Sequence, residues 1–137
     1  EELTKINVDD IIKLNIQKNL IGSALAGSIG GFNYHAANII AGIFIGTGQD
    51  IAQIGTSSVC ITDYYLENDK LNINLSMSSL EVGIIGGGTH IDTQTNCIDL
   101  MSDTKSEINN KTVNLENNAN LSAGIISSTV LSGEDYR

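Results

Sequence analysis

The amino-acid sequence predicts an α+β fold in which a buried central helix packs with a β-hairpin and flanking helices. Residues 33–44 are apolar at nearly every position of a helical repeat, which is typical of a buried helix. Residues 70–77 alternate instead, and a strand with one buried face carries such a pattern, here made by Leu71, Ile73, Leu75 and Met77. A chain of 137 residues buries one modest core, so we expect one domain or part of one.

The N-terminal region predicts a short amphipathic helix that ends near Leu14. Asn7 is a suitable N-cap, and the acidic side chains of Asp9 and Asp10 in the first turn favour the helix dipole. Residues 16–28 contain Gly22 and Gly27, and a glycine inside a helix costs on the order of 1 kcal/mol relative to alanine. We therefore predict no regular helix over residues 16–28, but a close approach between backbone segments.

The second half of the chain predicts a hairpin, a glycine turn and two helices. Residues 56–66 and 70–77 read as strands joined through residues 67–69. The stretch EVGIIGGGT at residues 81–89 lets the backbone pass close to a bulky ligand, although a flexible turn is the alternative. A short helix is expected over residues 91–101, a polar loop over 102–118, and a second buried helix over 121–131.

Composition excludes several classes of function. The net charge is −9 with seven Lys and Arg residues, which argues against nucleic acid or an anionic membrane surface as partner. Cys60 and Cys97 are too few for a disulfide framework or a zinc ribbon, so we expect a reducing compartment and no metal site. The longest apolar stretch, residues 36–48, is shorter than the roughly 20 residues that span a bilayer, so no membrane contact is expected from this chain.

Residues 18–50 are the first candidate site, because His35, Asn38 and Asp50 interrupt an apolar, glycine-rich run. A straight helix would place Asn38 and Asp50 roughly 18 Å apart. Either the glycines of GTGQD break the helix and fold Asp50 back, or the two residues contact opposite ends of a long ligand. The alternatives are a core histidine, a capping amide and a carboxylate at a turn.

Three stretches carry a resemblance to a known family: KNLIGSALAGSIGGFNYHAANII with GTGQD, then SSVCIT, then MSSLEVGIIGGGT. Together with NANLSAGIISSTVLSGE they resemble the catalytic domain of the eukaryotic-type (class I) hydroxymethylglutaryl-coenzyme A (HMG-CoA) reductases. The resemblance implies that residues 1–137 are the C-terminal part of that family's large substrate-binding domain, truncated at both ends. The chain departs from the family at Val59, where Asn is usual, and at Ser78, where Pro is usual.

The resemblance also implies site residues. Asp50 is the implied catalytic residue, and Lys18 the ligand of the substrate carboxylate, where a snorkelling side chain beside buried surface is the alternative. Since the resemblance assigns Asn38 and Asp50 both to the reaction centre, we expect the glycines of GTGQD to break the helix. Ile85 and Gly86 are implied on the nicotinamide side. The remaining implied substrate contacts are Lys5 at the coenzyme A phosphates, where a solvated surface lysine is the alternative, His35 along coenzyme A, Asn38 near the thioester oxygen, and Gly86, Gly87 and Gly88 at the hydroxymethylglutaryl group.

The implied reaction is the reduction of HMG-CoA to mevalonate and free coenzyme A by two NADPH, in isoprenoid and sterol biosynthesis. The family's catalytic lysine and glutamate would precede Glu1, and its histidine would follow Arg137, so we expect this chain alone to be inactive. The resemblance further implies a homodimer or higher homo-oligomer, and a cytosol-facing catalytic domain of an endoplasmic reticulum membrane protein. The alternative is a non-catalytic relative, either a coenzyme A-ligand-binding domain or a structural dimerisation domain.

Overall fold

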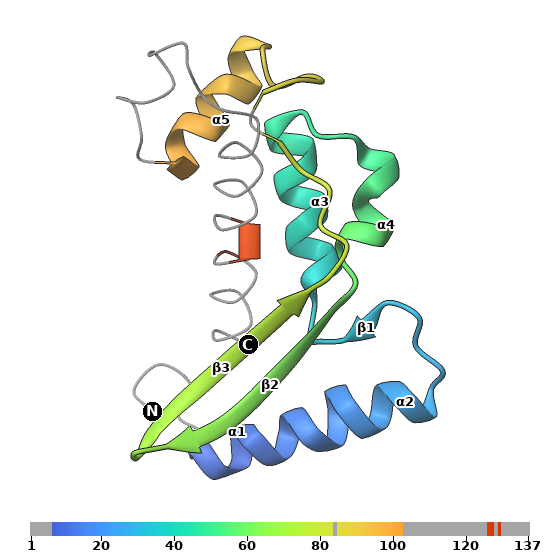
Figure 1. Cartoon of the computed structure of the whole chain (residues 1–137), viewed down its shortest axis with the longest axis vertical. Helices are drawn as coiled ribbons and strands as arrows, with labels where there is room; N and C mark the ends of the chain where they lie inside the picture. The colour runs from blue at the N-terminus through green and yellow to red at the C-terminus, as the bar shows by residue number, and fades with distance from the viewer. Residues whose placement is uncertain (1–6, 84, 103–125, 128, 130–137) are drawn as a thin grey trace.

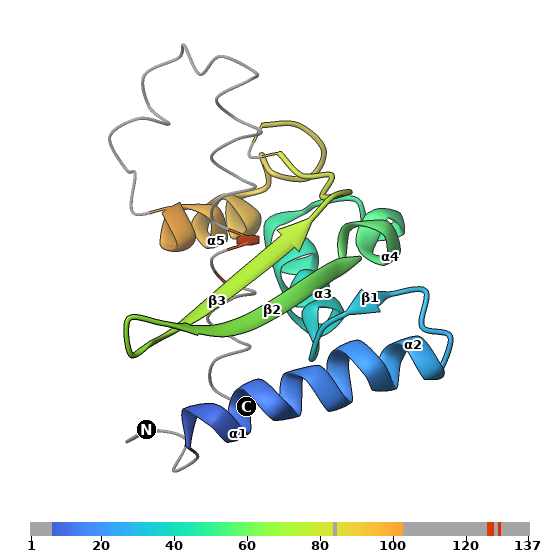
Figure 2. The ribbon, with the colours of Figure 1, turned by 60° about the horizontal axis from the view of Figure 1, so that its bottom comes forward.

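The computed structural model describes residues 7–83, 85–102, 126, 127 and 129. The described residues form the predicted α+β fold, with helix α3 (Ala36–Thr47) at its centre. A three-stranded sheet has the order β1-β2-β3, made by β1 (Gly31–Phe32), β2 (Cys60–Glu67) and β3 (Lys70–Met77). Figures 1 and 2 show a long helical segment that crosses one end of the hairpin and continues alongside β1. The N-terminal end of α3 and helix α4 (Ile54–Ser57) lie at the opposite end of the hairpin.

The N-terminal helical segment is longer than the sequence predicts. Helix α1 (Val8–Leu14) has the predicted cap, since Oδ1 of Asn7 accepts from the Asp9 amide at 3.2 Å. The prediction of no helix over residues 16–28 is wrong, because the chain continues as the π-helix η1 (Asn15–Gly22) and as α2 (Ser23–Leu25). The segment ends in a Schellman motif at Gly27 (φ 66°), where the Ser28 amide donates to the Ser23 carbonyl at 3.0 Å.

A buried pair of asparagines explains why this segment is helical. The Nδ2 atom of Asn15 donates to the Thr62 carbonyl of β2 at 3.1 Å, and Nδ2 of Asn19 donates to Oδ1 of Asn15 at 2.8 Å. Both side chains are almost completely buried. Leaving such groups unsatisfied would cost about 1–3 kcal/mol each, which exceeds the helix penalty of Gly22. Tertiary hydrogen bonds therefore outweigh local propensity here.

The predicted hairpin is confirmed, with a different start. Strands β2 (Cys60–Glu67) and β3 (Lys70–Met77) pair antiparallel, and a two-residue turn joins them through Asn68 (φ 51°) and Asp69 (φ 59°). Strand β1 (Gly31–Phe32) pairs parallel with the start of β2. The predicted strand start at residue 56 is wrong, because η2 (Ile51–Gln53) and α4 (Ile54–Ser57) extend the helical region that Asp50 caps.

Helix α3 (Ala36–Thr47) forms the core of the described residues. It begins three residues later than predicted, because the Asn33 side chain stays outside the helix and its Oδ1 accepts from the Ala36 amide at 3.0 Å. The helix ends before Gly48 (φ 71°), so the predicted break at the glycines is confirmed. The buried apolar cluster contains Ala36, Ile40, Ile43, Phe44, Cys60 and Ile126.

Helix α5 (Asp92–Ser102) is also confirmed and packs against α3. Most of the helix predicted over residues 121–131 lies outside the described residues; Ile126 is described, helical and buried. The predicted loop lies outside them as well, apart from residue 102. Among the described helices, none combines the length and apolar character that crossing a bilayer requires.

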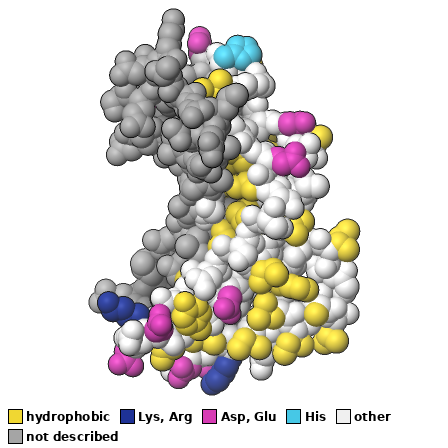
Figure 3. All heavy atoms as spheres, in the orientation of Figure 1, with side chains coloured by type: hydrophobic (Ala, Val, Ile, Leu, Met, Phe, Trp, Pro, Cys, Tyr) yellow, Lys and Arg dark blue, Asp and Glu magenta, His cyan; other side chains and the backbone are white. Residues whose placement is uncertain are grey.

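Large apolar side chains remain exposed on one face of the described residues. Ile21 is 53% exposed, Leu25 84% and Ile29 95%. Figure 3 shows apolar side chains gathered at the lower right, where α2 lies in Figure 1. Isolated exposed apolar residues are common, but a contiguous group of this kind is typical of a contact with further protein.

Candidate functional site

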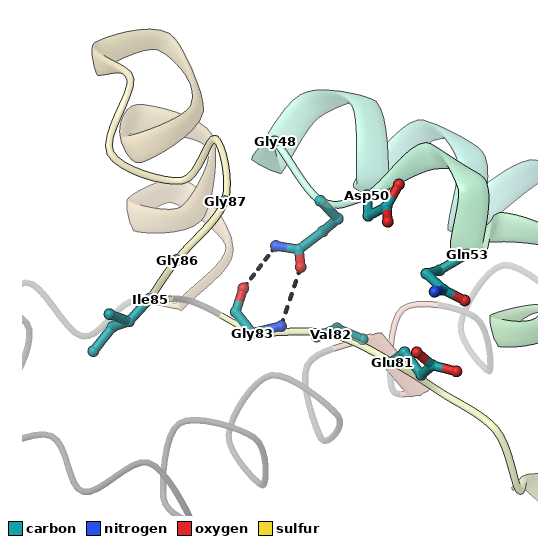
Figure 4. Close-up of a pocket in the computed structure, with 10 residues that line it drawn as sticks. Gly48, Asp50, Gln53, Glu81, Val82, Gly83, Ile85, Gly86 and Gly87 are labelled. Carbon is teal, nitrogen blue, oxygen red and sulfur yellow. Dashed lines mark hydrogen bonds between the residues drawn. The ribbon is translucent and has the colours of Figure 1, made fainter.

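A pocket of about 350 Å³ lies where the end of α3 meets the glycine segment that follows the hairpin (Figure 4). Two stretches distant in sequence form its walls. The first wall contains Gly48, Gln49, Asp50 and Gln53, and the second contains Glu81, Val82, Gly83, Ile85, Gly86 and Gly87. The pocket is thus formed by two of the motifs that carry the resemblance, GTGQD and EVGIIGGGT.

Backbone and side-chain contacts hold the two walls together. The Gln49 side chain donates from Nε2 to the Gly83 carbonyl at 2.7 Å, and its Oε1 accepts from the Gly83 amide at 3.1 Å (Figure 4). The Gly88 amide donates to the Gly48 carbonyl at 3.1 Å. A Cβ atom on Gly48 would stand 2.6 Å from the Gly88 carbonyl carbon, so this approach requires glycine.

The triple-glycine turn has a defined conformation. Gly86 (φ 117°) and Gly87 (φ 57°) occupy the region of φ that favours glycine. The buried Thr89 side chain fixes the turn, because its Oγ1 donates to the Gly86 carbonyl at 2.6 Å and lies 3.1 Å from the Gly86 amide. The close approach predicted for these glycines is made to the backbone of Gly48, and a ligand contact stays a prediction.

Asp50 lies at the rim of the pocket with an exposed side chain. Its Oδ1 accepts from the Ala52 amide at 3.0 Å, so the carboxylate is also the N-cap of η2. This bond uses one carboxylate oxygen and leaves the other available to a donor. The Glu81 carboxylate lines the same pocket, and two carboxylates at one rim suit a cationic group.

Lys18, His35 and Asn38 lie towards the other end of α3. The Lys18 Nζ is 5.0 Å from the centroid of the Tyr34 ring, within the range of a cation–π interaction. His35 is at the N-cap position of α3, and Asn38 is exposed in the first turn. Thr47, the last residue of α3, comes nine positions after Asn38, which corresponds to about 13.5 Å along the helix axis.

The structure thus brings some of the predicted site residues together and separates others. Asp50, Ile85, Gly86 and Gly87 share one pocket, and Gly88 contacts its wall. None of Lys18, His35 and Asn38 lines that pocket: Lys18 of η1 lies beside Tyr34, and His35 and Asn38 lie at the start of α3. Lys5 lies outside the described residues. The roles of all these residues stay predictions, because their positions alone assign no ligand.

Sequence reasoning missed Gln49, Gln53 and Glu81 as pocket residues. Gln49 carried a signal, since it is a polar side chain between a helix-ending glycine and Asp50. Its partner Gly83 lies 34 residues away, and no local pattern indicates that pairing. Within residues 7–83, 85–102 and the three later described residues, no group of three or more His, Cys, Asp or Glu is placed to hold a metal ion.

The pocket suits the reacting end of a ligand. Known ligand pockets occupy roughly 300–1,000 Å³, so this one has the size for a planar ring or a short acyl group. A Cβ on Gly86 would meet nothing within 4 Å, so open space lies beside this glycine. The Ile85 side chain, 52% exposed, provides an apolar surface at the same rim. A nicotinamide ring at Ile85 and Gly86 stays a prediction.

Three known proteins to which this chain is similar are named as reductases, so the class to which the comparison points is that of the reductases. The 3-hydroxy-3-methylglutaryl-coenzyme A reductase of Fusarium fujikuroi is 49% identical over 130 residues, which are 95% of this chain and 13% of that protein. The 3-hydroxy-3-methylglutaryl-coenzyme A reductase 2 of Arabidopsis thaliana is 44% identical over 134 residues, which are 98% of this chain and 23% of the length of that protein. Reductase 1 of Dictyostelium discoideum is 46% identical over 136 residues, 98% of this chain and 24% of its own.

The family itself follows from a second comparison. The model of the family described as Hydroxymethylglutaryl-coenzyme A reductase matches residues 1–134. The chain therefore belongs to the HMG-CoA reductase family, as the resemblance implies. It spans between 13% and 24% of the three relatives described above.

Proposed function

We propose that the protein containing this chain reduces HMG-CoA to mevalonate and free coenzyme A with two NADPH, in isoprenoid and sterol biosynthesis. Family membership supports the proposal. One observation carries it furthest: Asp50 and the glycine turn, both implied at the reaction centre, line the same pocket. Both hydrides add to the same carbon, first in the thioester and then in the aldehyde that remains when coenzyme A leaves. One proton goes to the coenzyme A thiolate and one to the oxygen of the new alcohol. The site must therefore stabilise a developing oxyanion and deliver protons.

Asp50 would act by holding the lysine that the family supplies from another part of the protein. Its Oδ1 is anchored to the Ala52 amide, so the carboxylate is preoriented, and its second oxygen can accept from an ammonium group. An ammonium held there would face the charge that develops on the substrate oxygen. Ile85 and Gly86 would hold the nicotinamide ring of NADPH, which supplies the hydride when bound.

Lys18, His35 and Asn38 would contact the substrate as the resemblance implies, with His35 along coenzyme A and Asn38 near the thioester oxygen. A lysine ammonium is a suitable partner for the free carboxylate of the substrate, provided that it leaves the Tyr34 ring. Lys5 would contribute at the coenzyme A phosphates.

We further propose a homodimer or higher homo-oligomer, and a catalytic domain that faces the cytosol from the endoplasmic reticulum membrane. The family resemblance supports both, and the exposed apolar group of Ile21, Leu25 and Ile29 supports contact with further protein. Light scattering of the purified full-length protein measures the oligomer, and cell fractionation with protease protection measures the location. A monomer, or a lumenal catalytic domain, would contradict the respective proposal.

The test of the activity uses the full-length protein with HMG-CoA and NADPH, followed by the loss of NADPH absorbance and the formation of mevalonate. We expect turnover by the wild type and none by Asp50→Asn. Asparagine also caps helix N-termini, so this variant should keep η2 folded. Asp63→Asn, at an exposed position of β2, is the matched control and should retain full activity.

Two other outcomes would contradict this proposal. Normal turnover by Asp50→Asn would remove Asp50 from its role. Coenzyme A binding without NADPH oxidation by the wild type would instead favour the non-catalytic relative. We also expect residues 1–137 on their own to oxidise no NADPH, and turnover by this chain alone would show that it contains a complete site.

A further inference from the structure

We propose that Gln49 is a positioning residue whose side-chain amide sets the spacing between Asp50 and the glycine turn. The inference rests on the proposed function and adds a residue to which the resemblance assigns no role. Gln49 would touch neither substrate nor cofactor. It would act through the two walls of the pocket that it joins.

The side chain of Gln49 binds both polar groups of one backbone residue. Nε2 donates to the Gly83 carbonyl at 2.7 Å, and Oε1 accepts from the Gly83 amide at 3.1 Å (Figure 4). A primary amide is the side-chain group that carries a neutral donor and a neutral acceptor side by side. Sliding Gly83 along the pocket would break both bonds together, so the pair fixes position as well as distance.

The backbone on each side of this contact is also held in place. The Gln49 amide donates to the Phe44 carbonyl of α3 at 2.9 Å, so the residue is anchored to the buried helix. On the opposite wall, the Gly88 amide donates to the Gly48 carbonyl at 3.1 Å. Residues 85–87 therefore lie between two contacts with the end of α3, and loss of the Gln49 pair would free one side.

The neighbouring glutamine shows that lining the pocket does not by itself create this link. Oε1 of Gln53 accepts from the Thr56 hydroxyl at 3.1 Å, and this contact stays within one helical region. Among the described residues, the Gln53 side chain therefore makes no hydrogen bond to the second wall. Gln49 adjoins Asp50 in sequence, and its partner Gly83 is two residues before Ile85. A change at this link is transmitted directly to both groups implied in the reaction.

The experiment measures steady-state kinetics of the full-length protein with Gln49→Met, which keeps the side-chain length and removes both hydrogen bonds. Misplacement by about 1 Å can cost about 100-fold in rate, so we expect kcat per folded molecule to fall by about 10- to 100-fold. KM for HMG-CoA should change little, whereas the melting temperature should fall because the Gly83 backbone loses two part-buried hydrogen bonds, and kcat is therefore normalised to the folded fraction. Gln17→Met, on the exposed surface of η1, is the matched control and should keep the wild-type kcat.

Gln49→Glu provides a readout that a merely structural role would not produce. One oxygen of the introduced carboxylate still accepts from the Gly83 amide, but the other faces the Gly83 carbonyl oxygen and has no proton to donate to it. This repulsion favours the protonated form and raises the pKa of the introduced acid. We expect the activity deficit relative to wild type to shrink as pH falls from about 8 to about 5.5, as the acid regains a donor. Asp50 and Glu81 line the same pocket, so the result is expressed as a ratio to wild type at each pH.

Hydrogen–deuterium exchange of the full-length protein tests the link without relying on activity. We expect peptides that contain the Gly83 amide to exchange faster in Gln49→Met than in the wild type or in Gln17→Met. Unchanged exchange, or a wild-type kcat in Gln49→Met, would overturn the inference while the proposed function stands. A wild-type protein without reductase activity would overturn the proposed function itself.

Discussion

Replacing Gly48 by alanine tests the geometry of the pocket most directly. Gly48 has a φ of 71°, and a left-handed conformation costs a residue with a side chain roughly 1–2 kcal/mol. The added Cβ would also stand 2.6 Å from the Gly88 carbonyl carbon, whereas ordinary contacts begin at 3.4 Å. The walls must therefore separate by the difference of 3.4 and 2.6, about 0.8 Å.

We expect two measurable effects of Gly48→Ala in the full-length protein. The strained backbone should lower the melting temperature by an amount that corresponds to about 1–2 kcal/mol. The displaced wall should lower kcat by about 10- to 100-fold, because proximity effects fall steeply over 1 Å. Melting is measured by circular dichroism and kcat by NADPH oxidation, normalised to the folded fraction.

Gly55→Ala is the matched control for this prediction. Gly55 lies in α4 with no positive φ, and a Cβ there would meet nothing within 4 Å. Alanine is the better helix former by roughly 0.5–1 kcal/mol, so this variant should be as stable as the wild type or more so, and fully active. A wild-type kcat and melting temperature for Gly48→Ala would refute the geometric reasoning.

Three further predictions concern stability and are checked by thermal melting of the full-length protein. Asn15→Ala should cost about 1–3 kcal/mol, since it removes the bond to the Thr62 carbonyl and leaves Nδ2 of Asn19 without its buried acceptor. Asp69→Gly should raise stability by about 0.5–1 kcal/mol, because glycine adopts the φ of 59° without strain. Phe44→Ala should cost about 3–5 kcal/mol, because this side chain is fully buried in the core.

Local patterns in the sequence predicted the elements whose structure depends on neighbouring residues. Alternation over residues 70–77 identified β3, and Asn7 identified the start of α1. The glycines of GTGQD made a helix break one of two alternatives, and a left-handed residue, Gly48, does end α3. In each case the determining interaction lies within a few residues of the pattern.

The errors arose where distant residues decide the structure. Residues 16–25 are helical because Asn15 binds the carbonyl of Thr62, which is 47 residues away. The candidate site divides in the same way. The sequence marked Asp50 and the triple glycine separately, but the bridge between Gln49 and Gly83 depends on how the end of α3 meets the segment after the hairpin. Periodicity describes one element and carries no information about such pairings.

The contacts of Gly48 with Gly88, and of Gln49 with Gly83, bring together the two ends of a long segment of the chain, residues 50–82. This segment, which includes β2 and β3, begins and ends at the pocket. The exposed turn at Asn68 and Asp69 is at the far end of this segment, well away from the contacts that join its two ends (Figures 1 and 2). A fluorophore or short epitope inserted at that turn would therefore label the protein without disturbing the contacts that form the pocket.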